Sequence, residues 1–387
     1  MKTEELLQYR RQLIEDTVRL KKRERVPHFS NICLWLVLDY GCRLTEACSD
    51  WQLMEKCQLA FFNKYKFDFA QTIAGLLCHP MAMIKDIGQG FYFYNDVNST
   101  VSLRDMRLLL PNEYEQFIAD LPRYTWEVLL PRKYERWPEL KVKDLLEPLA
   151  EYQRYTDFAT RMGEAAVTRY SIPRASAEMV GMPGIEMLCN LYTGMKGLAI
   201  DMRRQPEKVK AAVQMLESGT DAVVQRILEE PRQNNVAAFD LWLGMLAHNF
   251  LSIKQWDAYY WPWLKKVLDA VVAADKTAYI FVEGYVSRFY DYFRVFPAGH
   301  IALHIEQDDV YEVKKNLPNC CVVGGMSSTL LGSGSKEQCI ARAKQLIDEL
   351  GKDGGFILSQ DKMISYMRDA DPANLKAVCD FVSEYYI

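Results

Sequence analysis

Two residues near the C-terminus, His304 and Glu306, have the types and the spacing to act on one substrate or one metal ion. They lie in the apolar run IALHIE, and residues two apart on a strand share a face. A zinc site would need at least a third ligand and an open position for substrate. Glu283 ends the preceding apolar run, AYIFV, and is the candidate for that third ligand. The alternative for Glu283 is a structural ion pair with Arg288 or His304, because a buried carboxylate needs a partner.

Five further residues are candidates for binding substrate. Gly324 and Gly325 follow the run CCVV, where glycine lets a ligand approach the backbone closely or lets the chain turn. Gln360 ends the run GFILSQ, and Tyr366 lies beyond it, where it could close over a substrate. Arg288 follows Glu283 and could bind an acidic group.

These candidates need elements that bring them to one place. Short apolar runs alternate with helical patterns along the C-terminal third, which is typical of strand–helix units in a parallel sheet. Ser335 and Gln338 have capping-box spacing at the start of the best-marked helix, which Gly351 follows. Ligands of such sheets bind beyond the carboxyl ends of the strands, where the candidates lie. The fold class that we predict is α/β, a (β/α)8 TIM barrel.

The rest of the chain is predicted to be scaffold. Residues 1–65 read as an N-terminal helical extension and residues 66–387 as one barrel domain, since no linker or repeat divides the chain. The run from 67 to 74 is a candidate strand. Residues 88–110 alternate aromatic and polar side chains, which predicts a hairpin excursion. Residues 171–184 are rich in Pro, Gly and Met and are expected to form a loop.

Composition excludes several classes of protein. The 387 residues carry a net charge of −4, with a pI near 5.9, which argues against binding nucleic acid. No apolar run reaches the length of a membrane span, and the charged N-terminal stretch does not resemble a signal peptide. The 10 cysteines have no regular spacing, as expected for reduced thiols. We therefore expect a cytoplasmic protein.

Specific motifs resemble the uroporphyrinogen decarboxylase superfamily. The resemblance is seen in the segments GGMSSTLLGSGSKEQCIARAKQLIDELGKDGGFILSQ and DADPANLKAVCDFV. Other stretches resemble the corrinoid-dependent methyltransferase branch: RVPHF, EYEQFIADLPRYTWEVLLPRKY, GMKGLAIDMRRQPEKV, NFLSIKQWDAYYWPWLKKV and IFVEGYVSRFYDYF. The resemblance spans nearly the whole chain and implies a (β/α)8 barrel with its site at the carboxyl ends of the strands.

The resemblance implies one of two activities. The decarboxylases act on a tetrapyrrole without a cofactor and resemble one another in an Arg-Gln-Ala-Gly-Arg-Tyr segment, which this chain lacks; its Arg11–Gln12 lies in a charged helix. The methyltransferases move a methyl group between a small molecule and a corrinoid carried on a partner protein. The missing segment favours the second activity.

The metal implied by the methyltransferase branch is zinc, held by a His-x-Cys pair and a later Cys. Its histidine matches His304, whereas Glu306 replaces the paired cysteine and the later cysteine falls near Lys362. The resemblance thus leaves two alternatives: zinc held by Glu283, His304 and Glu306, or a site without metal. The same three residues are the candidates for catalysis.

Three functions stay open at this point: methyl transfer, decarboxylation of a tetrapyrrole or smaller acid, and non-catalytic binding of such a molecule in the barrel. For methyl transfer, the expected partners are a small methyl donor or acceptor and a corrinoid-binding protein. A homodimer is one candidate assembly.

Overall fold

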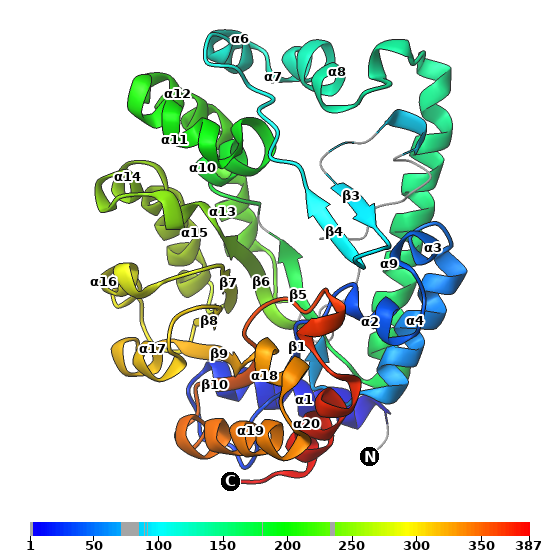
Figure 1. Ribbon diagram of the computed structural model, residues 1–387. Coiled ribbons are helices and arrows are strands. Elements are labelled where there is room, and N and C mark those ends of the chain that lie inside the picture. Colours follow the sequence, from blue (N-terminus) through cyan, green and yellow to red (C-terminus); the bar gives the residue numbers. More distant parts are fainter. Residues whose placement is uncertain (1–2, 71–84, 89, 91, 180, 233–236) are drawn as a thin grey trace.

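Eight parallel strands form one sheet that curves into a barrel in the computed structural model of the chain (Figure 1). The structure describes residues 3–70, 85–88, 90, 92–179, 181–232 and 237–387. The strand order follows the chain, with the hairpin of β3 and β4 left outside. The strands are β1 (Phe29–Ser30), β2 (Phe69–Ala70), β5 (Arg174–Met179), β6 (Ala237–Met245), β7 (Ala278–Val282), β8 (Ile301–Ile305), β9 (Cys321–Met326) and β10 (Phe356–Gln360).

The first and last strands close the barrel. Parallel bridges join His28 to Leu358 and Ile32 to Ile364. The backbone N–H of Asn31 also donates to Oε1 of Gln360 at 2.9 Å. The prediction of a TIM barrel is confirmed.

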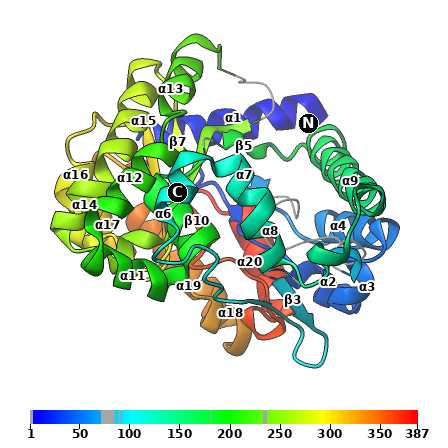
Figure 2. The ribbon, with the colours of Figure 1, turned by 90° about the horizontal axis from the view of Figure 1, so that it is seen from above.

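Helices surround the strands, and Figure 2 shows them from above. The helices that precede β5 in the chain are α1 (Thr3–Val18), α2 (Trp35–Asp39), α3 (Leu44–Ala47), α4 (Trp51–Lys64), α6 (Tyr114–Ala119), α7 (Leu121–Tyr124), α8 (Leu130–Lys133) and α9 (Leu146–Tyr170). Then follow α10 (Gly184–Met187), α11 (Gly194–Arg204), α12 (Pro206–Leu216), α13 (Thr220–Glu229), α14 (Ile253–Tyr259), α15 (Trp261–Ala273), α16 (Tyr290–Phe293), α17 (Val310–Asn316), α18 (Ser328–Ser333), α19 (Lys336–Leu350) and α20 (Pro372–Glu384). No helix within the described ranges has both the length and the apolarity that crossing a membrane requires.

Local signals placed several elements correctly. β7 and β8 coincide with the apolar runs, and α19 begins after Ser335, whose side chain accepts from the backbone N–H of Gln338. The excursion at 88–110 contains the predicted hairpin, β3 (Tyr92–Asn95) paired antiparallel with β4 (Thr100–Leu103). In Figure 1 this hairpin stands beside the upper part of the barrel.

The structure differs from the sequence-based expectation at two strands. β1 lies inside residues 1–65, so the barrel begins before the predicted boundary; two residues are too few to show an alternating pattern. β5 occupies part of the predicted loop at 171–184, because its sequence, RASAEM, mixes charged and small residues and has no run of large apolar ones. β2 covers part of the candidate strand at 67–74, whose remainder lies outside the described residues.

The barrel interior is packed largely with aromatic and small side chains. Along β7 and β8, alternate residues point inward and the others pack against the surrounding helices, as strand geometry requires. The inward residues on these two strands include Tyr279, Phe281 and Ala302. This alternation decides which strand-end side chains face the barrel axis.

Candidate functional site

Two carboxylates lie side by side at the carboxyl end of the barrel. Phe281 pairs with His304 and Val282 with Ile305, so Glu283 and Glu306 come next on neighbouring strands. The alternation that turns Phe281 inward turns Glu283 the same way. The structure therefore brings together two of the three predicted catalytic residues.

Glu283 titrates far from the usual range of a carboxyl group. Burial, followed by the negative charges of Glu306 and Glu186, raises the pKa of Glu283 to about 7. Such a group exists in both protonation states near neutral pH, which suits it to proton transfer. Its backbone N–H donates to the carbonyl of Met245 at 2.9 Å, which fixes the strand end that carries it.

Glu186, which the sequence did not single out, is the third carboxylate of this region. It is 1% exposed, and its Oε1 accepts from the backbone N–H groups of Leu246 and Ala247 at 2.6 and 2.8 Å and from the hydroxyl of Tyr260 at 2.9 Å. Burial raises its pKa despite these donors. Glu186 lies in the short helix α10, which begins after Pro183, and not at the end of an apolar strand. The strand-end pattern used in the sequence analysis therefore did not find it.

His304 is buried, and both of its ring nitrogens are engaged. Nε2 lies 2.7 Å from the carbonyl oxygen of Gln360, which can only accept, so Nε2 carries the proton. Nδ1 then accepts from the hydroxyl of Tyr279 at 2.5 Å. Burial lowers the pKa of His304 to about 4, which keeps the ring neutral. His304 is a locked structural histidine in this arrangement.

The predicted zinc ligands do not fit a metal site. Neither nitrogen of His304 is turned to a common point with the carboxylates, and Oε2 of Glu306 accepts from the backbone N–H of Gly284 at 2.6 Å. Across the described ranges, no group of three or more His, Cys, Asp and Glu residues is placed to hold a metal ion.

Aromatic side chains lie in the barrel below the carboxylates. The rings of Trp242 and Tyr279 are nearly parallel, with centroids 6.5 Å apart, and Phe281 meets the ring of His304 edge-on at 5.0 Å. Gly244 makes room for Trp242, since a Cβ there would come within 3.2 Å of the indole. Trp242, in β6, is an aromatic residue of this region that the sequence analysis did not single out.

Gly324 and Gly325 have structural roles in the described chain. Both have positive φ, at 127° and 88°. A Cβ on Gly324 would lie 3.0 Å from the carbonyl oxygen of Ile305, and one on Gly325 would lie 3.0 Å from Leu346 of α19. Both lie inside β9, paired with Leu358 and Ser359 of β10, so the chain does not turn at them, and what the contacts show is close packing against Ile305 and Leu346.

The other predicted binding residues hold loops together. Gln360 is buried, and its amide oxygen closes the barrel seam at Asn31. Arg288 donates to the carbonyl oxygens of Leu251 and His248, both at 3.1 Å, and no ion pair with Glu283 forms. The hydroxyl of Tyr366 donates to the carbonyl of Val101 in β4 at 3.2 Å, so it bridges the last strand-end loop and the hairpin.

Comparisons with known proteins agree with this architecture. The family model for uroporphyrinogen decarboxylase (URO-D) matches residues 184–385. Among solved structures, a methyltransferase from Methanosarcina mazei is similar, with a TM-score of 0.60 and 16% sequence identity over 97% of this chain and 98% of that one. No curated protein matches by sequence. At this identity the structural likeness shows the fold alone.

Proposed function

This chain belongs to the uroporphyrinogen decarboxylase family, and from that membership we propose that it is a methyltransferase acting between a small molecule and a corrinoid on a partner protein. The observation that carries the proposal is the pairing of Glu283 with Glu306 at the carboxyl end of the barrel. Similarity to a methyltransferase over nearly the whole of both chains supports the choice within the family.

Glu283 supplies the proton that methyl transfer requires. When a methyl group leaves a neutral ether or thioether, the heteroatom keeps the bonding electron pair, becomes an alkoxide or thiolate, and needs a proton to become a stable product. A carboxyl group with a pKa of about 7 holds such a proton in a large fraction of molecules at neutral pH. Glu283 donates it and becomes a carboxylate; in the reverse direction it takes the proton back.

Glu306 acts on Glu283 through its charge. Its own carboxylate is held by the backbone N–H of Gly284, so its position beside Glu283 is fixed. The like charge contributes to the raised pKa of Glu283 and is its largest cause after burial. Glu306 is therefore a positioning and tuning residue in this proposal.

The aromatic side chains favour a substrate whose methylated group is apolar and uncharged, such as an ether or a thioether. Their rings give apolar surface to such a group, and Glu283 can protonate the heteroatom as the methyl group leaves. Trp242 and Glu283 come from neighbouring strands, β6 and β7. The corrinoid, when its carrier protein docks, supplies the cobalt that accepts or gives up the methyl group.

The proposal is tested by following a corrinoid spectrum. The protein is mixed with cob(I)alamin and a series of methylated amines, ethers and thioethers, and formation of methylcobalamin is recorded. We expect turnover with at least one ether or thioether donor. Glu283→Gln should lose most of the activity, because an amide cannot donate an acidic proton, whereas Glu312→Gln on the exposed face of α17 should not.

The pH profile separates a catalytic from a structural Glu283. The rate of the wild type in the direction that protonates the leaving group should fall as pH rises through about 7, the pKa of Glu283. The absence of any spectral change with every donor, or full activity of Glu283→Gln, would contradict the proposal.

Decarboxylation is the second candidate, favoured by the name of the matching family model. Against it stand the carboxylates at the carboxyl end of the barrel, which repel a substrate carrying carboxylates, and the use of Arg288 in holding backbone carbonyls. Incubation with uroporphyrinogen and chromatography of the oxidised porphyrins decide between the two. Conversion to coproporphyrinogen would establish decarboxylation and displace methyl transfer.

A further inference from the structure

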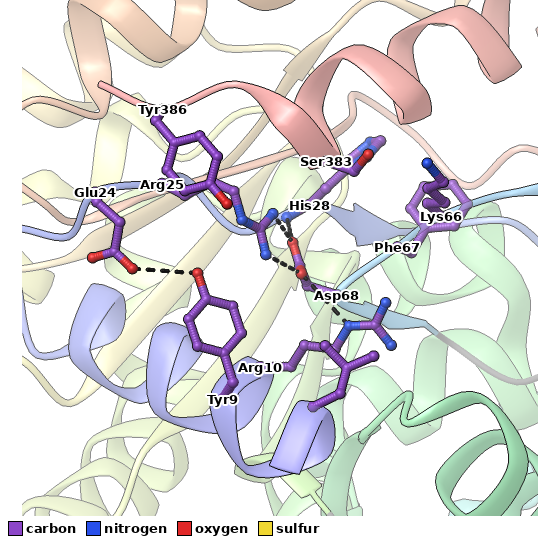
Figure 3. A pocket seen from close by; sticks show the side chains of 11 residues that line it. Tyr9, Arg10, Glu24, Arg25, His28, Lys66, Phe67, Asp68, Ser383 and Tyr386 are labelled. Atoms are coloured by element: carbon purple, nitrogen blue, oxygen red, sulfur yellow. Dashed lines mark hydrogen bonds and ion pairs between the residues drawn. The ribbon is translucent and has the colours of Figure 1, made fainter. Parts of the chain in front are cut away.

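A polar cavity of about 340 Å³ lies at the amino end of the barrel, and its charged side chains pair with one another (Figure 3). Nη1 and Nη2 of Arg25 donate to Asp68 at 2.9 and 2.5 Å, and Nε of Arg10 lies 3.7 Å from the same carboxylate. These pairs hold α1 and the segments before β1 and β2 together. The lining also includes Tyr9, Glu24 and His28. At the carboxyl end, a single side chain holds the turn that carries Glu283.

That side chain is the amide of Asn249, in the loop after β6. Its Nδ2 donates to the backbone carbonyl of Glu283 at 2.5 Å, and its Oδ1 accepts from the backbone N–H of Tyr285 at 3.2 Å. Nδ2 also donates to the carbonyl of Leu246, in its own loop, at 3.2 Å. One asparagine thus joins the end of β6 to both residues that flank Gly284 in the turn after β7.

Gly284 and Asn249 fit each other closely. Gly284 has a φ of 81°, in the region that favours glycine. A Cβ at this position would overlap the side-chain amide of Asn249. From the other side, the N–H of Gly284 donates to Oε2 of Glu306 at 2.6 Å. The turn is therefore held from the end of β6 by Asn249 and from the end of β8 by Glu306.

The carboxyl group of Glu283 depends on this turn for its position. Within the described part of the chain it has no hydrogen bond of its own, so its backbone and its packing place it. The ionisable groups that face it are Glu306, Glu186 of α10 and Tyr260, between α14 and α15. All three are acidic, and none attracts a carboxylate. A buried carboxylate without a partner is unfavourable, so a free turn would let Glu283 move towards water.

We infer that Asn249 is a positioning residue, whose amide holds the turn after β7 so that the carboxyl group of Glu283 stays in the barrel mouth beside Glu306. The inference rests on the proposed function, because it gives Asn249 a part in the proton transfer by Glu283. Both polar atoms of the Asn249 side chain are bonded to backbone groups. Asn249 therefore acts through Glu283 and not on the substrate.

Asn249→Ala should let the carboxyl group of Glu283 reach water. Its pKa, about 7 in the wild type, should fall by about one unit or more towards the ordinary value of 4.5. ¹³C NMR of protein labelled at the glutamate carboxyl carbons measures this pKa, and the signal of Glu283 is the one that Glu283→Gln lacks. At pH 7 the protonated fraction, and with it kcat, should fall about fivefold, while KM changes little.

Asn319→Ala is the matched control. Asn319 is also a half-buried asparagine, but it precedes β9 at the amino end of the barrel. Its Nδ2 donates to the carbonyls of Phe293 and Phe296 at 3.0 and 2.9 Å. The control removes the same number of donated bonds to backbone carbonyls and should leave the pKa of Glu283 unchanged. Equal shifts in the two variants would indicate general loosening and would overturn the inference.

Gly284→Ala reaches the same contact from the other side. The added Cβ displaces the amide of Asn249, so the pKa of Glu283 should again fall. In the double variant with Asn249→Ala, the glycine substitution should add less than it does alone, because the amide that it displaces is already gone. Additive changes in the pKa would contradict the coupling.

The wild type provides a readout that needs no variant. The side-chain amide resonances of Asn249, assigned by their proximity to Tyr285, should shift with a midpoint at the pKa of Glu283, and those of Asn319 should not. The inference is overturned if they do not follow this titration, or if Glu283 keeps its pKa in folded Asn249→Ala. These titrations require no turnover, so they decide the inference even where no donor is demethylated and the proposed function fails.

Discussion

The two ends of the barrel treat buried charge and buried imidazole in opposite ways. At the amino end, Asp68 is paired with two arginines, whereas at the carboxyl end Glu283 faces two other carboxylates. For the histidines, the well-paired side chain is at the carboxyl end and the unpaired one at the amino end. His304, towards the carboxyl end, has both ring nitrogens bonded, and His28, at the amino end, has neither.

This difference teaches that neither end is purely structural or purely functional. In TIM barrels the carboxyl end usually carries catalysis and the amino end stability. The carboxylates follow that division, since like charges side by side oppose folding. His28 departs from it, because a buried ring without hydrogen bonds lowers stability. Variants at both ends can therefore test the comparison directly.

The largest effect is expected for Asp68→Asn. Removing the carboxylate leaves two buried guanidinium groups without a counter-charge, which should lower the free energy of unfolding by about 3–5 kcal/mol. Urea denaturation at neutral pH measures it. Glu24→Gln, at the rim of the same cavity and with a half-exposed side chain, should change stability by no more than about 0.5 kcal/mol. Equal effects of the two substitutions would show that the pairing at Asp68 is unimportant.

The histidines should respond differently to the same substitution. His304→Leu strands the hydroxyl of Tyr279 and the carbonyl of Gln360 in the barrel interior, at a cost of about 2–5 kcal/mol. His28→Leu breaks no side-chain hydrogen bond and should change stability by less than about 1 kcal/mol. Thermal unfolding of both variants compares them; a larger loss for His28→Leu would reverse our assignment of roles.

Acidification provides a third test. Burial lowers the pKa of both His28 and His304 to about 4, below the ordinary value of 6.5, so the folded protein prefers the neutral rings. Their contribution to stability is complete above pH 6.5 and is lost as the pH falls through about 4, by roughly 3 kcal/mol for each ring. In a pH series of denaturant titrations, His28→Leu should lose a visible part of this slope. An unchanged slope would mean that His28 is not buried as described.

Glu283→Gln should stabilise the protein at alkaline pH. The raised pKa means that the folded state holds the proton more tightly than the unfolded state, so stability is greatest below about 4.5 and falls as pH rises through about 7. The amide removes this loss, with a gain of roughly 1–3 kcal/mol at pH 8 and little change at pH 4. Differential scanning fluorimetry at the two pH values measures it. The same gain at both values would point to packing instead of charge.

The smallest effect is expected at Tyr366→Phe. The substitution removes the hydroxyl that donates to Val101, a partly exposed contact worth about 0.5–1 kcal/mol. Hydrogen exchange should quicken in β4 and leave β7 unchanged. Equal protection of β4 in both proteins would show that Tyr366 does not hold the hairpin.

The sequence predicted the elements whose signals are local. β7 and β8 are continuous apolar runs, and the cap of α19 is fixed by residues three apart. β1 and β5 have no such signal, because β1 has two residues and β5 mixes charged and small residues without a run of large apolar ones. The positions of β1 and β5 are determined by barrel closure and by pairing with neighbouring strands. A pattern read along the sequence gives no information about either.

The candidate site was predicted in part for the same reason. The sequence placed Glu283 and Glu306 at the ends of consecutive strands, and the structure brings these two residues together. It also grouped His304 with them, because the sequence does not show that Tyr279 and Gln360 occupy the ring nitrogens of His304. Glu186 lies in the same region but comes from a helix about 100 residues earlier in the sequence. Only the fold brings it close to the other two carboxylates, so the sequence pattern did not show it.

The seam between β1 and β10 also has a consequence for how the chain folds. Asn31 and Gln360 are separated by 329 positions, and the bridges beside them span similar distances. Contacts this far apart carry a high loop-closure entropy and form slowly. During synthesis, the residues of β1 are made long before β10 exists, so one edge of the growing sheet stays open until late. We expect this unclosed intermediate to be the species most prone to aggregation, and a chaperone that shields strand edges to raise the yield of folded protein.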